Sequence, residues 1–322
     1  STIEIVRPRS SRYFYFSEIA NAFSWKGHLL QGYFNGPDDV YNPENGERLF
    51  TLDDRIDISF AESSQLVFAC YWLQAEAYIK GEDITKDVYY ETLEEAINNA
   101  EDGDTVVVIT NINLTKTLTI SSDITLIADS DGNYSITRAK FVDGYMFEIK
   151  ADVVFGQADA SNILTISGND IDSDFGGIRV SNSATLTLNN SVTLSNHITS
   201  TLGGGAVYVI GTLNYAGANI QYNTAKNGGA IYVEGTINLS EGNGTINNNT
   251  ALNAGGGVYL SDNSTIVMNG GSITSNKAKL GAGLYYGSNK QNTILGGRIV
   301  YNNTEGNQAS PLSSIDNTYR GG

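Results

Sequence analysis

Short apolar runs in the second half of the chain recur with a nearly constant period. Examples are "AIYV", "TINL", "GVYL" and "TIVM". They are brief, rich in β-branched and aromatic residues, and separated by Gly and Asn, which predicts strands and not helices. Three series of equivalent positions repeat about every 26 residues, a period typical of solenoids: Asn196, Asn223, Asn249, Asn276 and Asn302; Ile178, Val207, Ile231, Val258 and Leu284; Thr185, Thr212, Thr236, Thr265 and Thr293.

Three short segments in each repeat predict a coil that stacks on identical coils. The predicted fold is all-β: a right-handed single-stranded parallel β-helix with three strands per coil, regular from about residue 176. The stacked Asn side chains are expected to form a structural ladder of hydrogen bonds along the axis. The glycines suit tight corners that need a positive φ. Neither the fixed Leu spacing of leucine-rich repeats nor the hexapeptide period of left-handed β-helices is present.

A short helix is predicted at 92–100, just before the less regular coils. Thr92 is its expected N-cap, and Glu95 is the capping-box partner three residues later. Its apolar stripe is Leu93, Ala96, Ile97 and Ala100. Because a solenoid must cover its open end, we expect this helix to cap a β-helix that spans 81–322. The arrangement resembles the N-terminal cap of pectin-lyase-like β-helices.

The C-terminal repeats carry a second resemblance, over roughly 176–303. A Gly-Gly-Ala-apolar element stands at 204–207 and 228–231 and recurs in altered form at 255–258 and 281–284. An Ile-x-x-Asn element stands at 220–223, 246–249, 273–276 and 299–302. Such repeats resemble those of polymorphic outer-membrane proteins and other β-helical bacterial surface adhesins, in which an aromatic residue takes the place of the Ile. The resemblance implies a structural scaffold on a cell surface.

Residues 1–80 are expected to form a separate, small β-rich module. They hold 15 of the 32 aromatic residues and both Trp. The segments Gly32-Tyr33-Phe34, Tyr41 and Ala69-Cys70-Tyr71-Trp72 resemble the Listeria–Bacteroides surface repeat of the internalin B-repeat type. That resemblance implies a β-grasp-like fold, with the junction to the β-helix at 80–86. The single cysteine, Cys70, cannot form an internal disulfide and is expected to be a buried apolar residue.

Composition limits the partners and the location. A net charge of −16 argues against nucleic acid and against anionic membranes, because both require a basic surface. No apolar run approaches the length of a membrane span, and no signal peptide is visible. We therefore expect a monomer at the bacterial cell surface or secreted outside the cell, with its anchor outside these residues. The acidic excess lies in the first two-thirds, since 201–322 holds 5 acidic and 6 basic residues.

The sequence predicts no catalytic residues, although many parallel β-helices cleave polysaccharides. Galacturonan lyases need carboxylates for calcium and a basic residue, and glycosidases need a pair of carboxylates. After Ser200 no acidic pair recurs on a shared ladder. A binding protein is thus favoured over an enzyme, and a polysaccharide lyase or glycoside hydrolase remains the alternative.

One acidic cluster and the two histidines complete the candidate chemistry. Asp170, Asp172 and Asp174 have the spacing of oxygen ligands in a Ca²⁺ loop, and no other cofactor is expected. Phe175 stands where an EF-hand loop requires Gly, so a solvated acidic loop is the favoured interpretation. His197 is interpreted as a surface residue, and His28 carries no signal.

Four tyrosines form the candidate ligand site. Each follows an apolar residue of the second series, so strand alternation turns it outward: Tyr208, Tyr232, Tyr259 and Tyr285. An aromatic ladder stabilises a sheet, and it also offers a hydroxyl-bearing strip for sugar rings or peptide. The leading hypothesis is a non-catalytic adhesin-like protein that binds a host or environmental glycan or a surface protein. A structural stalk without a ligand is the second alternative.

Overall fold

The computed structural model of the chain describes residues 13–15, 28–35, 55–57, 68–82, 86–158, 160–290 and 292–304, and only the backbone before residue 74. Its contacts separate two units. One comprises Ser1–Glu76 with Tyr89–Thr92, and the other comprises Ala77–Val88 with Leu93–Gly322. Of the strand β6 (Val88–Tyr90), Val88 is assigned to the second unit and the other two residues to the first.

The first unit contains two antiparallel strand pairs. The strand β1 (Tyr13–Tyr15) pairs with β3 (Arg55–Asp57), and β2 (His28–Asn35) pairs with β4 (Phe68–Gln74). In the second pair the backbone of Tyr33 lies opposite Cys70. These strands agree with a β-rich module. Tyr41 and most of the β-grasp-like arrangement lie outside the described residues.

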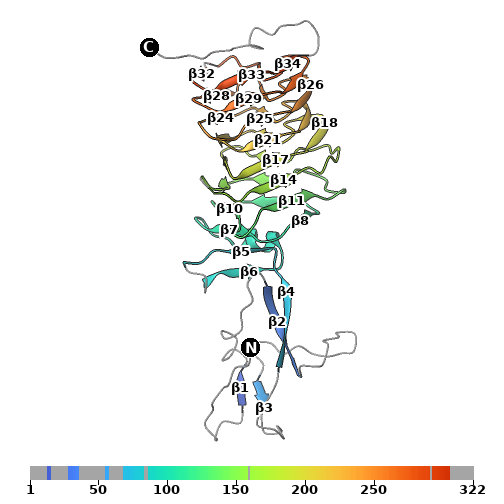
Figure 1. Cartoon of the computed structure of the whole chain (residues 1–322), viewed down its shortest axis with the longest axis vertical. Helices are drawn as coiled ribbons and strands as arrows, with labels where there is room; N and C mark the ends of the chain where they lie inside the picture. Colours follow the sequence, from blue (N-terminus) through green and yellow to red (C-terminus); the bar gives the residue numbers. More distant parts are fainter. Residues whose placement is uncertain are drawn as a thin grey trace. The chain divides into compact units, whose positions relative to one another are not determined.

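The second unit is a stack of coils with parallel sheets (Figure 1), which confirms the predicted β-helix architecture. The handedness of the coil stays a prediction. Three sheets run the length of the stack. The first sheet holds, in spatial order, β5 (Ala77–Ile79), β7 (Thr105–Val108), β10 (Thr125–Ala128), β13 (Asp152–Phe155), β16 (Thr185–Asn189), β20 (Thr212–Ala216), β24 (Thr236–Leu239), β28 (Thr265–Met268) and β32 (Thr293–Ile294).

The other two long sheets follow the first around each coil. The second sheet holds β8 (Ile112–Leu114), β11 (Tyr134–Arg138), β14 (Leu164–Ser167), β17 (Val192–Ser195), β21 (Asn219–Gln221), β25 (Ile246–Asn247), β29 (Ser272–Thr274) and β33 (Arg298–Val300). The third sheet holds β9 (Leu118–Ile120), β12 (Phe147–Ile149), β15 (Ile178–Val180), β19 (Val207–Val209), β23 (Ile231–Val233), β27 (Val258–Leu260) and β31 (Leu284–Tyr286).

A fourth, shorter sheet appears only in the coils from β16 onward, which we call the upper coils. It holds β18 (Ile198–Gly203), β22 (Thr224–Asn227), β26 (Thr250–Ala254), β30 (Lys277–Ala278) and β34 (Asn303–Thr304). The prediction of three strands per coil therefore describes the coils from β7 to β15, and a fourth strand follows the Asn of each later coil. The sequence pattern hid it because these strands bury few residues: β22 has the single buried residue Ala225.

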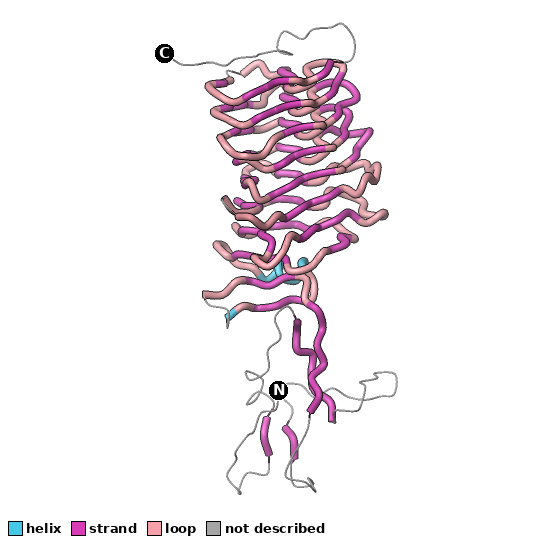
Figure 2. Tube along the Cα trace, viewed as in Figure 1, coloured by secondary structure: helices cyan, strands magenta, loops and turns pink. Residues whose placement is uncertain are grey.

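A helix and an antiparallel strand lie at the N-terminal end of the stack. The helix α2 (Leu93–Asn99) has the predicted buried stripe of Leu93, Ala96 and Ile97, and it packs against β5, β7 and β9. Figure 2 shows it as the cyan ribbon at the base of the coils. The strand β5 pairs antiparallel with β7, so the parallel stack begins at β7. This is the predicted N-terminal cap.

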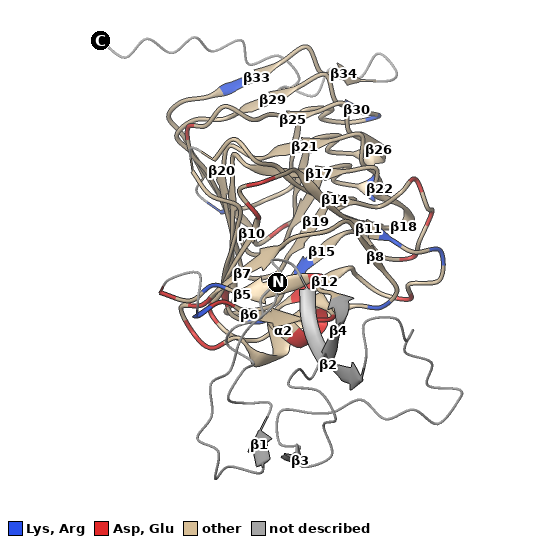
Figure 3. Cartoon of the chain, turned by 60° about the horizontal axis from the view of Figure 1, so that its bottom comes forward, with Lys and Arg blue, Asp and Glu red and all other residues tan. Residues whose placement is uncertain are grey.

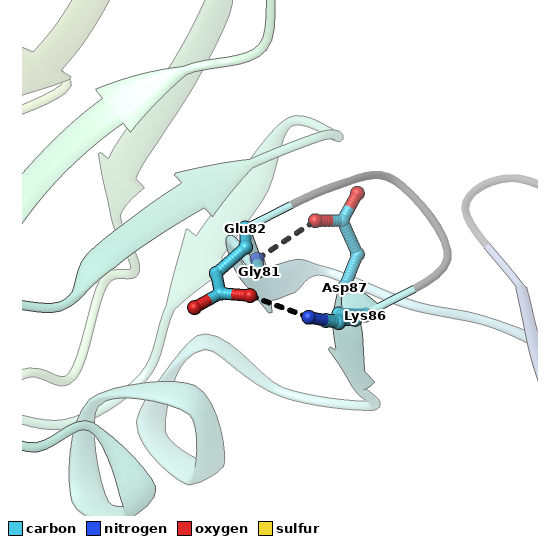
Figure 4. Close-up of polar contacts among 4 residues, drawn as sticks. All are labelled: Gly81, Glu82, Lys86 and Asp87. Atoms are coloured by element: carbon cyan, nitrogen blue, oxygen red, sulfur yellow. Dashed lines mark hydrogen bonds and ion pairs between the residues drawn. The ribbon is translucent and has the colours of Figure 1, made fainter.

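Polar contacts join the described residues 81–82 and 86–87, which lie between β5 and β6 in the sequence (Figure 4). The backbone N–H of Gly81 donates to Asp87 Oδ1 at 2.9 Å, and Lys86 Nζ donates to Glu82 Oε2 at 2.5 Å. The Lys86–Glu82 pair is exposed, with side chains 55% and 85% accessible, so it adds little to stability.

Strand alternation and repeated glycines shape each upper coil. In β19, β23 and β27 the first and third residues are buried and the middle one points outward. A pair of glycines comes shortly before each of these strands, at 204–205, 228–229 and 255–256. The two glycines of a pair meet different requirements. Gly228 has φ 60°, where L side chains are strained, and a Cβ on Gly229 would lie 2.4 Å from the carbonyl oxygen of Gly256 in the next coil. The motif is thus a requirement of the corner.

Candidate ligand-binding face

The four tyrosines lie in one column on the outer face of the third sheet. The register pairs Tyr208 with Tyr232, Tyr232 with Tyr259, and Tyr259 with Tyr285. Their ring centroids are 5.1, 4.9 and 4.8 Å apart, and adjacent ring planes differ by only 7–8°. We call this column the tyrosine stripe. Its spacing is that of neighbouring strands, because each ring belongs to one coil.

The stacking decides which parts of the rings remain accessible. Since the planes are parallel at less than about 5.5 Å, each inner ring has both faces covered by a neighbour. Tyr232 and Tyr259 therefore present their edges and hydroxyl groups to solvent, and their faces are not free for a sugar ring. Sugar rings therefore cannot stack on the faces of Tyr232 and Tyr259 in the way that the sequence predicted. A ligand on this face would instead contact a row of hydroxyl groups.

The hydroxyls of Tyr208, Tyr232 and Tyr259 stay protonated at physiological pH. Burial raises the pKa of Tyr208, of Tyr232 and of Tyr259 above the ordinary value. The carboxylate of Glu234 adds to this at Tyr208, whose hydroxyl donates to Glu234 Oε1 at 2.5 Å. The phenols of Tyr232 and Tyr259 can therefore both donate and accept a hydrogen bond, whereas the Tyr208 hydroxyl already donates to Glu234 and offers a ligand an acceptor only.

Below Tyr208 the same column continues with charged residues. The register places Arg179 under Tyr208 and Glu148 under Arg179. Arg179 Nη1 contacts Glu148 Oε1, and the two side chains are 34% and 25% accessible. The sequence contains no sign of this pair, because the two residues are 31 positions apart and Glu148 precedes the regular repeats.

Tyr145 lies beside this pair. Its ring centroid is 6.3 Å from that of Tyr208 and 5.3 Å from that of Phe175. Burial, with Arg179 opposing and Glu148 and Glu234 reinforcing, raises the pKa of Tyr145 to about 12. Arg179, Glu148 and Glu234 thus all act on one phenol. We call Tyr145, Glu148, Arg179, Tyr208 and Glu234 the anchor cluster.

The Asn ladder lies inside the coils, at the corner that follows the second sheet. Asn223, Asn249 and Asn276 are fully buried. Each side-chain N–H₂ donates to the Oδ1 of the next Asn: the distances are 2.9 Å for Asn223 to Asn249, and 3.0 Å for Asn249 to Asn276 and for Asn276 to Asn302. Each Oδ1 also accepts the backbone N–H of the residue below. Every amide is therefore bonded on both sides.

The lowest position of this ladder is held by His197, not Asn196. The backbone N–H of His197 donates to Asn223 Oδ1 at 3.0 Å. Asn196 precedes it with φ 58°, in the series Tyr222, Asn248, Ser275 and Tyr301, which have φ of 53–59°. The sequence alignment was shifted by one residue, because Asn suits the left-handed conformation as well as the ladder.

His197 is buried, so its interpretation as a surface residue was wrong. Its ring Nε2 lies 3.2 Å from the carbonyl oxygen of Ile166, which assigns the proton to Nε2 because a carbonyl only accepts. Nδ1 is buried and has no hydrogen-bond partner. Burial, followed by the charge of Arg138, lowers the pKa of His197 to about 3.

The three aspartates of the acidic cluster do not converge. Asp172 accepts hydrogen bonds from the backbone N–H and hydroxyl of Ser200 at 3.2 and 3.3 Å, and Asp174 accepts one from the Thr201 hydroxyl. Asp170 has φ 53°. Within the described part of the chain, no group of three or more His, Cys, Asp or Glu side chains is arranged to hold a metal ion. The proposed calcium site thus gains no support from the geometry.

Charge is distributed unevenly over the coils. Figure 3 shows the acidic and basic residues gathered toward the strands at the N-terminal end of the stack, while the strands from β20 upward carry few. Among the described residues no helix is long and apolar enough to cross a membrane. Comparison with protein-family models, curated proteins and solved structures gives no match.

Proposed function

We propose that this protein is a non-catalytic, adhesin-like binding protein of the bacterial cell surface or of the secreted fraction. It binds a host or environmental glycan or a surface protein along the tyrosine stripe. The single observation that carries the proposal is the row of four in-register phenols. Their rings are held rigidly by stacking, so few side-chain rotamers are lost when a ligand binds.

The mode of contact follows from the covered ring faces. A ligand gains hydrogen bonds to the phenol oxygens and van der Waals contact with the ring edges. The resemblance of the Gly-Gly-Ala-apolar repeats to surface adhesins supports an extracellular location. The nearly balanced charge of 201–322, with 5 acidic and 6 basic residues, supports recognition of a ligand through hydroxyls rather than through charge.

A double variant tests the stripe and its mode of contact together. Tyr232→Phe with Tyr259→Phe keeps the stacked rings and removes two hydroxyls. We expect an affinity about 5- to 150-fold lower for any ligand captured on an array of glycans and matrix proteins, since two hydrogen bonds contribute about 1–3 kcal/mol. The unfolding midpoint should not change. Tyr222→Phe, at an exposed tyrosine outside the stripe, is the control.

Two outcomes separate the alternatives. If Tyr232→Ser with Tyr259→Ser also leaves capture unchanged, the stripe is not the binding site. If the array yields no ligand at all, a structural stalk replaces a binding protein as the function.

A glycan-cleaving enzyme is a second candidate, supported by the anchor cluster. There Glu148, Arg179 and Glu234 all act on the phenol of Tyr145. With a pKa of about 12, Tyr145 stays protonated at neutral pH, so it would donate a hydrogen bond to a bound substrate and would not act as a base. New reducing ends or unsaturated uronates from a polysaccharide panel, absent with Tyr145→Phe, would establish this activity.

A further inference from the structure

The anchor cluster and the tyrosine stripe form one continuous column. Six successive strands of the third sheet, from β12 to β31, contribute one outward residue each: Glu148, Arg179, Tyr208, Tyr232, Tyr259 and Tyr285. Neighbouring positions are about 4.8 Å apart along the axis. The column thus offers a linear polymer an ion pair at one end and a row of hydroxyls beyond it.

We propose that this column binds a linear, uncharged glycan along the coil axis, with one sugar residue held at the anchor cluster. The inference rests on the proposed function and names its ligand class. Sugar hydroxyls donate and accept hydrogen bonds, as do the phenols of the stripe. Arg179 contacts Glu148 and has more N–H groups than one carboxylate oxygen can accept, so donors remain for a ligand.

Charge excludes an acidic polymer. Glu148 balances Arg179, and the further carboxylates of Glu234 and Asp262 lie close enough to the stripe to act on the pKa of Tyr232. The anchor cluster and its surroundings are therefore net negative, as is the whole chain at −16. A uronate or sulfated glycan would be repelled over distances within the screening length.

The backbone of the same sheet disfavours an extended peptide. Peptides commonly bind to a sheet by adding a strand to a free edge. The strands β19, β23 and β27 are each paired on both sides, so no strand can be added beside Tyr208, Tyr232 or Tyr259; β31, which carries Tyr285, is the end strand of the sheet. What the column presents to a ligand is side-chain hydrogen bonding alone, and that matches a glycan.

Calorimetry with defined hexasaccharides tests this inference. The probes are cellohexaose, mannohexaose, hexa-N-acetylchitohexaose and hexagalacturonate, titrated into the 322-residue chain. We expect at least one uncharged hexasaccharide to bind tenfold or more tightly than hexagalacturonate, with an affinity insensitive to salt. Arg179→Gln should weaken that binding about tenfold, whereas Arg298→Gln, at an exposed arginine of the second sheet, should not.

The outcomes distinguish this inference from the proposed function. Hexagalacturonate binding as tightly as the uncharged probes, or Arg179→Gln without effect, overturns the inference and leaves the stripe as a binding site. Capture of a matrix protein that depends on Tyr232 and Tyr259, with no hexasaccharide bound, also overturns it. If neither glycans nor proteins bind, the proposed function fails as well.

Discussion

The lower coils, up to β15, and the upper coils, from β16, differ in how they provide hydrogen-bond partners for buried backbone groups. At the corner after the second sheet, the upper coils stack identical amides. The lower coils use one long cation: Arg138, the last residue of β11, is 2% exposed. It donates to the carbonyl oxygens of Gly144 at 2.9 Å and Gly176 at 2.6 Å, with longer bonds to Val142, Ser173 and Phe175.

The difference shows what a regular repeat makes possible. Where successive coils have nearly the same length, equivalent residues lie directly above one another. A short side chain such as Asn can then form hydrogen bonds with the equivalent Asn in the next coil. Where loops of unequal length leave buried carbonyls at irregular places, a long side chain with several donors is needed. His197 lies in the first of the upper coils. Its Nε2–H donates to the carbonyl oxygen of Ile166, which is the bond to the coil below that each buried Asn of the ladder also makes.

The largest expected effect tests the lower solution. Arg138→Met removes the donors that satisfy the buried carbonyls of Gly144 and Gly176, so we expect a loss of about 4 kcal/mol in the free energy of unfolding. Lys140→Met, at an exposed cation two residues on, should change it by less than about 0.5 kcal/mol. Urea denaturation measures both. Equal stability of the two variants would mean that the corner loops do not depend on Arg138.

A somewhat smaller effect tests the upper solution. Asn249→Ala leaves the backbone N–H of Asn223 without its acceptor and removes one acceptor of the Asn223 side chain. It also removes the side-chain donor to Asn276 Oδ1 and to the carbonyl oxygen of Ile220, while the backbone N–H of residue 249 still donates to Asn276 Oδ1. We expect a loss of about 3 kcal/mol. Asn253→Ala, at an exposed Asn of the same strand region, is the matched control. If Asn249→Ala leaves the free energy of unfolding unchanged, the Asn ladder does not stabilise the upper coils and is not equivalent to Arg138 in the lower ones.

The smallest effect concerns His197 and depends on pH. Unfolded His197 titrates near its ordinary pKa of 6.5, and folded His197 only at about 3. The unfolded state therefore binds more protons between these values, so stability is full above pH 6.5 and falls as the pH is lowered toward 3. We expect the wild type to lose about 2 kcal/mol more than His197→Asn between pH 7 and pH 5.

Unfolding midpoints at the two pH values measure this difference, and His28, which both proteins share, cancels in it. Parallel pH profiles would show that folded His197 binds a proton as readily as unfolded His197, so that its pKa is not lowered by burial. That result would also mean that the ladder does not end in a neutral imidazole.

The proposed identity as a surface adhesin and the physical origin of the repeat motif are separate matters. The paired glycines are explained by a left-handed corner and by the close approach of the next coil. Any solenoid with this corner needs them. The motif is thus strong evidence for the architecture, whereas the ligand must be found from the outward residues.

The sequence by itself determined the period, the strands and the side of each strand that faces the core, because alternation and spacing are local properties that survive in any coil of this kind. It therefore predicted the column of tyrosines and three of the buried amides. Only the tertiary structure decided the register between coils of unequal length. Because of that register, His197 and not Asn196 lies below Asn223 in the ladder. The same register stacks the tyrosine rings face to face. It also brought Glu148 and Arg179 together, since contacts between residues about one coil apart depend on how the coils stack and not on local propensity.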